Sequence, residues 1–341
     1  MQLGQAVRRF NDQVRAGWSA LTHSLARTSS PAARGRGMGA LARRALLLLV
    51  ALIALYYGIG ALLMQRIDTN PDFTIDPAEV LEGESESVAY AASVLAREVN
   101  RYGWVSNDPF YLPTSLLWNM GAYQTGILST VLHFTESLGQ ALTARGMASS
   151  DLDAAAVRLS RPGDVWEWDL SNPLGFLGRS ENQYREGILA LNGFNVAVAD
   201  GSAPLPRDAA LLAAVLDGFG QSLDAAAHHL TEEAKSKLVF FDTDISDAFY
   251  EAKGTAYTEF VIFRGLKTDF GAVIRAHDAE GEFDNVAAAL KDAALLSPLF
   301  IANGAPDGAI FPSHPYVASY FLLRAKDALD DLVAKLGKDK D

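Results

Sequence analysis

The chain of 341 residues contains no cysteine, and lysine is missing from its first 234 positions. Without thiols the protein cannot form disulfides, thiolate nucleophiles, iron–sulfur clusters or cysteine-ligated zinc sites. Cations are in the minority overall, because 29 Lys and Arg stand against 41 Asp and Glu and give a formal charge of −12. Nucleic-acid binding needs clustered basic side chains, so this composition argues against nucleic acid as the main partner.

The few cations are concentrated at the N-terminus. Residues 1–44 hold eight arginines and one aspartate, a formal charge of +7, so residues 45–341 carry −19. The stretch Ala45–Met64 carries no charge, and its twenty residues extend about 30 Å as a helix, which matches the hydrocarbon core of a bilayer. Arg43 and Arg44 flank the N-terminal end of this stretch. The positive-inside rule therefore predicts a cytoplasmic N-terminus and a main domain on the other side of the membrane.

A cleaved signal peptide is the alternative to a membrane anchor at 45–64. Such a peptide has a compact leader, an apolar run of about 7–15 residues and a small-x-small cleavage site. Here the leader is 44 residues long, and Leu62–Gln65 makes a poor cleavage site. The sequence therefore predicts an uncleaved signal anchor. Within it, Ala54 and Gly58 form a small-xxx-small pair that can pack two such helices as a homo-oligomer, although ordinary lipid-facing composition explains the pair as well.

The basic leader carries an apolar stripe on one face of a predicted helix. Arg8 and Arg9 lie off this stripe, so we predict a basic amphipathic helix at an anionic membrane surface. A docking helix for a cytoplasmic partner and a weakly structured tail are the alternatives. Pro, Gly and Ser dominate Thr28–Gly39, which predicts a flexible linker up to the anchor. The stripe itself steps by three or four positions through Leu3, Val7, Phe10, Val14, Trp18, Leu21 and Leu25.

Beyond the anchor and an acidic juxtamembrane linker at 65–83, helical patterns alternate with Gly and Pro. Residues 164–169 alternate apolar and acidic side chains as in a short strand, but no regular series of strands follows. The predicted fold is all-α: an amphipathic helix, one transmembrane helix, and a helical-bundle domain over 84–337 before a charged tail at 338–341. Its helices are predicted at 85–101, 114–145, 151–159, 181–199, 207–236, 246–264, 284–296 and 315–336.

One segment allows a second topology. Pro109–Thr135 contains no Asp, Glu, Lys or Arg over 27 residues, which is long enough to span a bilayer. Asn119 and Gln124 make its insertion into lipid costly, whereas a protein core can satisfy them. A buried core helix is therefore favoured, and a second membrane pass is the alternative.

Motifs for catalysis and for metal binding are absent from the sequence. It has no phosphate-binding G-x-x-x-x-G-K, no H-E-x-x-H and no G-x-S-x-G. His228 and Glu232 are spaced i, i+4, but they belong to a polar run typical of an exposed helix face. The acidic alternations at 242–246 and 278–284 lack the Gly and Glu of a calcium loop. We therefore expect no catalytic residue, no metal and no cofactor.

The strongest binding candidates surround the start of the long predicted helix at 114–145. Flat aromatic faces beside amides are typical of a groove that binds sugar or peptide. The same side chains can instead close the end of a bundle, with the amides satisfying loop backbone. Both interpretations stay open for the six candidates: Trp104, Asn107, Asp108, Trp118, Asn119 and Gln124.

Short motifs scattered along the chain add a family resemblance. They are Gly103-Trp104, Asn107-Asp108-Pro109, Asn119-Met120, Gln124-x-Gly126, Trp166, Tyr184-Arg185-x-Gly187, Asp247-x-Phe249-Tyr250, Asp269-Phe270, Asn303-Gly304 and Leu323-Arg324-Ala325. Together they resemble a bacterial membrane-anchored family known as domain of unknown function 2333, over residues 45–337. The resemblance implies a protein of the bacterial inner membrane and brings no activity or catalytic residue with it.

Two functional hypotheses follow from these patterns. The first is a non-enzymatic, single-pass inner-membrane protein whose acidic periplasmic domain binds an envelope partner, either a protein or a glycan. The second is a membrane-anchored hydrolase of peptidoglycan or a related polymer, with a pair of carboxylates near Trp104 and Asp108. A groove without acidic residues would favour the first hypothesis, and two converging acids beside Trp104 and Trp118 would favour the second.

Overall fold

The computed structural model describes residues 31–76, 80–164, 180–236, 243–298, 301–303 and 313–337, with only the backbone given at 31–39, 236 and 243. The predicted leader helix with Arg8 and Arg9, the strand at 165–169 and the tail at 338–341 lie outside these residues. The chain divides into two compact units, Met1–Gly60 and Ala61–Asp341.

The first unit contains most of helix α2, which runs from Pro31 to Met64. The most apolar 18-residue stretch within Ala40–Met64 has a mean hydropathy of 2.5 and is not buried, so this portion is long and apolar enough to span a membrane. On the N-terminal side of this portion the structure differs from the prediction. Residues from Pro31 onward are helical, whereas a flexible linker was predicted at Thr28–Gly39. Proline suits the first helical turn, and the alanines and arginines that follow it favour a helix.

The second unit is built from helices, and the residues described in it contain no β-strand, only an isolated bridge between Asn303 and Ser313. The predicted all-α class is confirmed. A π-helical turn at Arg97–Gly103 extends α3, a 3-10 turn at Pro113–Leu116 precedes α4, and the short helix α9 was not predicted. The α-helices are α3 Glu86–Ala96, α4 Trp118–Thr143, α5 Ser150–Leu159, α6 Ser180–Ala199, α7 Ala209–Ser236, α8 Thr243–Asp269, α9 Gly271–Ala276, α10 Glu280–Ala294 and α11 His314–Leu336.

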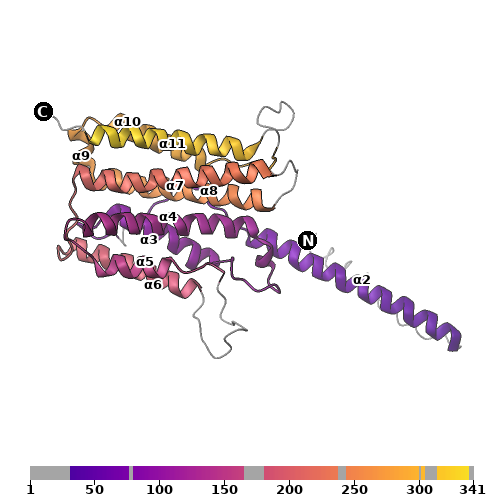
Figure 1. Ribbon diagram of the computed structural model, residues 1–341. Helices are drawn as coiled ribbons and strands as arrows, with labels where there is room; N and C mark the ends of the chain where they lie inside the picture. The colour runs from indigo at the N-terminus through magenta and orange to yellow at the C-terminus, as the bar shows by residue number, and fades with distance from the viewer. Residues whose placement is uncertain are drawn as a thin grey trace, which may run out of the picture. The chain divides into compact units, whose positions relative to one another are not determined.

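These helices pack in successive layers, as Figure 1 shows. Helices α10 and α11 cover α7 and α8, which in turn pack on α4 and α3, and α5 with α6 form the outer layer beyond them. Helix α8 lies at the centre, because it contacts α3, α4, α7, α10 and α11. Its buried residues Phe249, Tyr257 and Phe263 supply a large part of the hydrophobic core.

Helices α4 and α8 approach each other closely at two glycines. A Cβ atom on Gly126 would overlap the carbonyl oxygen of Glu251, and a Cβ atom on Gly254 would overlap that of Tyr123. Gly265 lies equally close to the start of α3, where a Cβ atom would overlap the backbone of Ser87. Only glycine permits backbones to lie at this separation, which explains three glycines inside a helical core despite their low helix propensity.

Helix α4 is a core helix and not a second membrane span. Tyr123, Ile127, Val131 and Phe134 are buried against neighbouring helices, as predicted for the favoured alternative. Its polar side chains are satisfied within the protein, for example by the hydrogen bond of 2.8 Å from Thr130 Oγ1 to the Gly126 carbonyl. Among the described residues, Ala40–Met64 is the one helix with the length and composition of a span.

The N-terminus of α3 is capped by a carboxylate from the end of α8. The oxygens of Asp269 accept hydrogen bonds from the Ser85 hydroxyl at 2.7 Å, the Glu86 amide at 2.9 Å, and the amide and hydroxyl of Ser87 at 3.0 and 2.7 Å. A negative charge at this position also complements the helix dipole. Asp269 therefore connects two helices that lie far apart in the sequence.

The segment that follows α2, within the predicted juxtamembrane linker, is bound to the bundle. Ile67, Phe73 and Ile75 pack against the hydrophobic core. The backbone carbonyl of Asp68 accepts hydrogen bonds from Arg97 at 2.9 Å and from the Tyr123 hydroxyl at 2.7 Å. Further along, the carbonyls of Asn70, Pro71 and Phe73 accept hydrogen bonds from Tyr257 and Arg264.

The close crossing of α4 and α8 leads to a first prediction. Gly254→Ala places a methyl group against backbone that cannot move without separating the helices, so we expect a loss of stability of about 2 kcal/mol or more. Gly281→Ala is the control, because that helical glycine faces open space and should gain up to about 1 kcal/mol. Thermal unfolding of the full-length protein in detergent, followed by circular dichroism, measures both. Equal effects of the two substitutions would contradict the tight crossing.

Candidate functional site

The six predicted site residues differ in burial: three are buried, Asp108 and Asn119 are partly buried, and Trp118 is exposed. Trp104 is one of the three buried residues, and its indole Nε1 donates a hydrogen bond of 2.7 Å to the Gly163 carbonyl. Its ring packs edge-on against Tyr184, with 4.8 Å between the ring centroids. A Cβ atom on Gly163 would lie within 2.9 Å of the Trp104 ring, so the indole fills the space beside this glycine. Trp104 is therefore a core residue and offers no open face to a ligand.

The two amides beside Trp104 are also occupied within the protein. Gln124 is fully buried, its Oε1 accepts from the Val105 amide at 3.1 Å, and its Nε2 donates to the Gly103 carbonyl at 2.8 Å. Asn107 Nδ2 donates to Glu181 Oε2 at 2.9 Å. Buried amides in such pairs satisfy polar groups that would otherwise be costly. These contacts hold the loop after Gly103 against α4 and α6.

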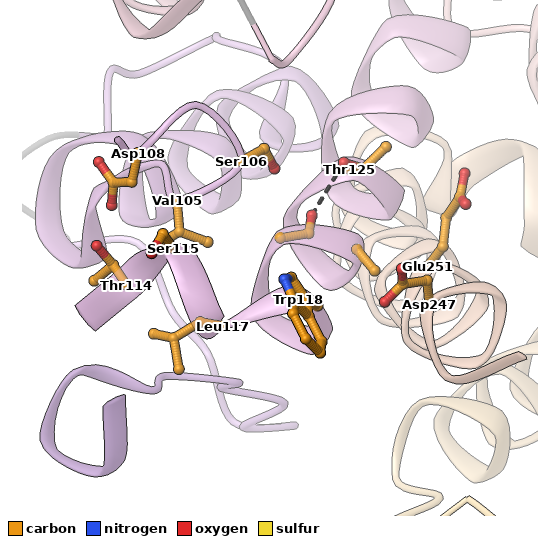
Figure 2. A pocket seen from close by; sticks show the side chains of 12 residues that line it. Val105, Ser106, Asp108, Thr114, Ser115, Leu117, Trp118, Thr125, Asp247 and Glu251 are labelled. Carbon is orange, nitrogen blue, oxygen red and sulfur yellow. Dashed lines mark hydrogen bonds between the residues drawn. The ribbon is translucent and has the colours of Figure 1, made fainter. Parts of the chain in front are cut away.

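A groove of about 340 Å³ lies next to this loop, at the start of α4 (Figure 2). Trp118 lines it and is 57% exposed, so one aromatic side chain is available to a ligand. The groove thus contains two of the six predicted residues, Asp108 and Trp118. Hydroxyl groups from Ser106, Thr114, Ser115 and Thr125 add hydrogen-bonding capacity to its wall.

Asn119 lies next to Trp118 in the sequence but has a different role. Its Oδ1 accepts a hydrogen bond of 2.7 Å from the Ser246 hydroxyl. This bond joins the first turn of α4 to the first turn of α8. Asn119 therefore positions the two helices whose side chains form the groove, and it is not among the residues that line it.

Two carboxylates in the groove were missed by the sequence analysis. Asp247 and Glu251 come from successive turns of α8 and lie beside Trp118, whereas Asp108 is at the other end of the groove (Figure 2). Asp247 belongs to a family motif, but the sequence holds no signal that places it near a residue 129 positions earlier. The close packing of α4 and α8 at Gly126 and Gly254 brings them together.

Burial gives both carboxyl groups unusual proton affinity. The pKa of Glu251 is raised by burial, with His229 opposing the shift from 4.0 Å away. The pKa of Asp247 is raised by burial and by the negative charges of Asp244 and Glu251. Within the described part of the chain, Asp247 Oδ1 is buried and has no hydrogen-bond partner. Such groups are common at binding and catalytic sites, where a ligand supplies the missing partner.

In the regions that the structure describes, no group of three or more His, Asp or Glu side chains is arranged to hold a metal ion. His228 Nε2 lies 3.7 Å from Glu232 Oε1, and both side chains are largely exposed on α7. This agrees with the interpretation of that pair as an exposed helix face.

Residues 217–338 match a family described as an uncharacterized protein conserved in bacteria (DUF2333). The family resemblance seen in the motifs is confirmed over these residues. The matched segment includes most of α7 and all of α8 to α11, so it supplies Asp247 and Glu251, while Trp118 and Asp108 lie outside it. No curated protein and no solved structure matches the chain.

Replacing Trp104 and Trp118 by phenylalanine, one at a time, tests which of the two rings is buried. Trp104→Phe leaves the Gly163 carbonyl without its donor, so we expect it to destabilise the protein by about 1–3 kcal/mol. Trp118→Phe removes an exposed indole and should change stability by no more than about 0.5 kcal/mol. Thermal unfolding of the two full-length variants gives the comparison. A larger effect at Trp118 would contradict the placement of both rings.

Proposed function

We propose that this protein is a single-pass protein of the bacterial inner membrane whose periplasmic domain binds an envelope glycan in the groove beside Trp118, without catalysis. The anchor is the apolar helix within Ala40–Met64, and Arg43 with Arg44 sets its orientation. The strongly acidic remainder of the chain then faces the periplasm. The family match to proteins conserved in bacteria agrees with this setting.

The arrangement of the groove is the observation that carries this proposal. Trp118 presents a large apolar ring at the surface, and carboxylates and hydroxyls surround it. A sugar ring has the complementary chemistry, because its C–H face packs on an aromatic ring while its hydroxyls donate hydrogen bonds to carboxylates. Asp247 and Glu251 are the carboxylates beside Trp118 that such hydroxyls would reach. The groove volume falls in the range of small-molecule sites.

Hydrolysis of the same polymer is the second candidate, because the groove is not free of acidic residues. Glycosidases use two carboxyl groups, one of which is protonated and acts as the acid. Asp247 and Glu251 both have raised pKa values and lie one helical turn apart. Both are on the same side of Trp118, however, and Asp108 is the acid at the opposite end (Figure 2). Binding is favoured because a glycosidase places its two carboxyl groups on either side of the scissile bond, whereas Asp247 and Glu251 approach Trp118 from one helix.

Sedimentation with purified peptidoglycan sacculi tests glycan binding. We expect the full-length protein in detergent to sediment with sacculi, and Trp118→Ala to weaken binding about tenfold, the equivalent of 1.4 kcal/mol. Tyr320→Ala is the matched control, because Tyr320 is an aromatic residue on α11 that is 62% exposed. Failure of the unaltered protein to sediment, or an equal loss in both variants, would contradict the proposal.

The same incubation separates binding from hydrolysis. Release of soluble reducing sugar should stay at background for a binding protein. If sugar is released, and if Glu251→Gln abolishes release but not sedimentation, the hydrolase is the correct function and the non-enzymatic proposal is wrong.

A further inference from the structure

A group of large apolar side chains is exposed immediately before and at the start of α4. We call Pro109–Trp118 the aromatic loop. Phe110 is 83% exposed and Tyr111 53%, and Leu116 and Trp118 are also exposed. Backbone hydrogen bonds such as that from the Leu112 amide to the Pro109 carbonyl at 2.9 Å give the loop a defined shape. Four exposed apolar side chains within nine residues are a concentration of the kind that contacts a partner or a membrane, and the rings of Phe110 and Tyr111 touch each other.

The position of the aromatic loop follows from its contacts with the end of α2. Leu117, Val105 and Met120 form a small hydrophobic cluster, and Ala61 and Ile67 pack against it. The Arg66 amide also lies 3.3 Å from Met120 Sδ. Ala61 precedes the end of α2 at Met64 by three residues, which is about 4.5 Å along a helix. The residues next to Leu117 therefore lie at the depth where the chain leaves the predicted span.

No flexible spacer separates this end of the anchor from the bundle. The segment that follows Ala61 is fixed by the hydrogen bonds of Arg97 and Tyr123 to the Asp68 carbonyl. The aromatic loop is consequently held close to the last turn of α2. A loop on a long tether would sample many distances from the bilayer, but this one has a single short connection.

The chemistry of the aromatic loop matches the bilayer interface. Trp and Tyr are enriched at the level of the headgroups, and Phe and Leu gain free energy by leaving water there. Between Gly103 and Trp118 the only charged side chain is Asp108, although residues 45–341 carry a formal charge of −19. Acidic surfaces are repelled by anionic lipids, whereas a nearly uncharged loop can approach them.

We propose that the aromatic loop is a membrane-contacting surface that places Phe110, Tyr111 and Leu116 among the lipid headgroups of the leaflet where the anchor ends. This inference rests on the proposed function only in requiring that α2 spans the bilayer. The groove beside Trp118 then opens at the level of the headgroups. Its ligand must be reached at the membrane surface, as a lipid-linked or membrane-proximal glycan would be.

The cysteine-free chain allows this surface to be probed with single labels. Phe110→Cys and Leu189→Cys are each labelled with the environment-sensitive fluorophore NBD in the full-length protein, reconstituted in phosphatidylethanolamine–phosphatidylglycerol vesicles. Leu189 is the matched control, because it is an apolar residue of α6 that is 68% exposed. We expect a blue-shifted emission at position 110 and several-fold stronger quenching by lipids with a headgroup-level nitroxide than at position 189.

Four outcomes would overturn the inference. Equal lipid quenching at both positions would mean that the aromatic loop is not special, and no lipid quenching at position 110 would mean that it lies away from the bilayer. Protection of position 110 from aqueous iodide without quenching by lipid would identify a protein as the occupant. Extraction of the protein by alkaline carbonate would contradict the membrane span, and with it both the proposed function and the loop inference. Failure to bind sacculi would contradict glycan binding alone and would not affect the loop inference.

Discussion

The buried guanidinium of Arg97 is the interaction on which the end of the domain next to α2 depends. Its side chain is 4% exposed and lies 2.8 Å from Glu98 and 3.5 Å from Asp68. It donates hydrogen bonds to the Tyr257 hydroxyl and the Asp68 carbonyl, both at 2.9 Å. It also lies over the rings of Phe73, Tyr102 and Tyr257, at 5.1 to 5.7 Å from their centroids. A buried cation is tolerated only with this degree of pairing, so the groups around Arg97 must assemble together.

The charge of Arg97 is maintained within the protein interior. Burial alone would lower its pKa, but the negative charge of Glu98 and the hydrogen bond to Tyr257 raise the pKa above its ordinary value. The cation joins three parts of the chain: the segment after the anchor through Asp68, the turn after α3 through Glu98, and α8 through Tyr257. That turn is π-helical and leads through Gly103, with φ +82°, into the loop that lines the groove. Arg97 therefore links the segment after α2 to the turn that leads into the groove loop.

The sequence predicted the features that depend on local pattern. Helical periodicity, glycine and proline positions and the uncharged run at 45–64 were sufficient to predict the helices, among them one long and apolar enough to span a membrane, and the all-α class. The groove was predicted only in part, because aromatic residues and amides in one loop do not reveal which of them face inward. Trp104 and Gln124 turned out to be core residues, whereas Trp118 lines the groove. Asp247 and Glu251 depend on the crossing of α4 and α8, which is a tertiary feature. The attachment of residues 66–75 to the bundle could not be predicted either, because the side chains that donate hydrogen bonds to their carbonyls lie far away in the sequence.

Double electron–electron resonance measures whether the segment after α2 is attached to the bundle. Nitroxides at Asp72→Cys and Val157→Cys would be measured in full-length protein in lipid nanodiscs, because both side chains are exposed. A pair at Val157→Cys and Ala272→Cys, within the bundle, gives the width expected for a fixed distance. We expect one distance peak for the first pair that is as narrow as the peak for the second. A broad distribution for the first pair beside a narrow one for the second would show that the segment is a free linker and that Arg97 does not hold it against the bundle.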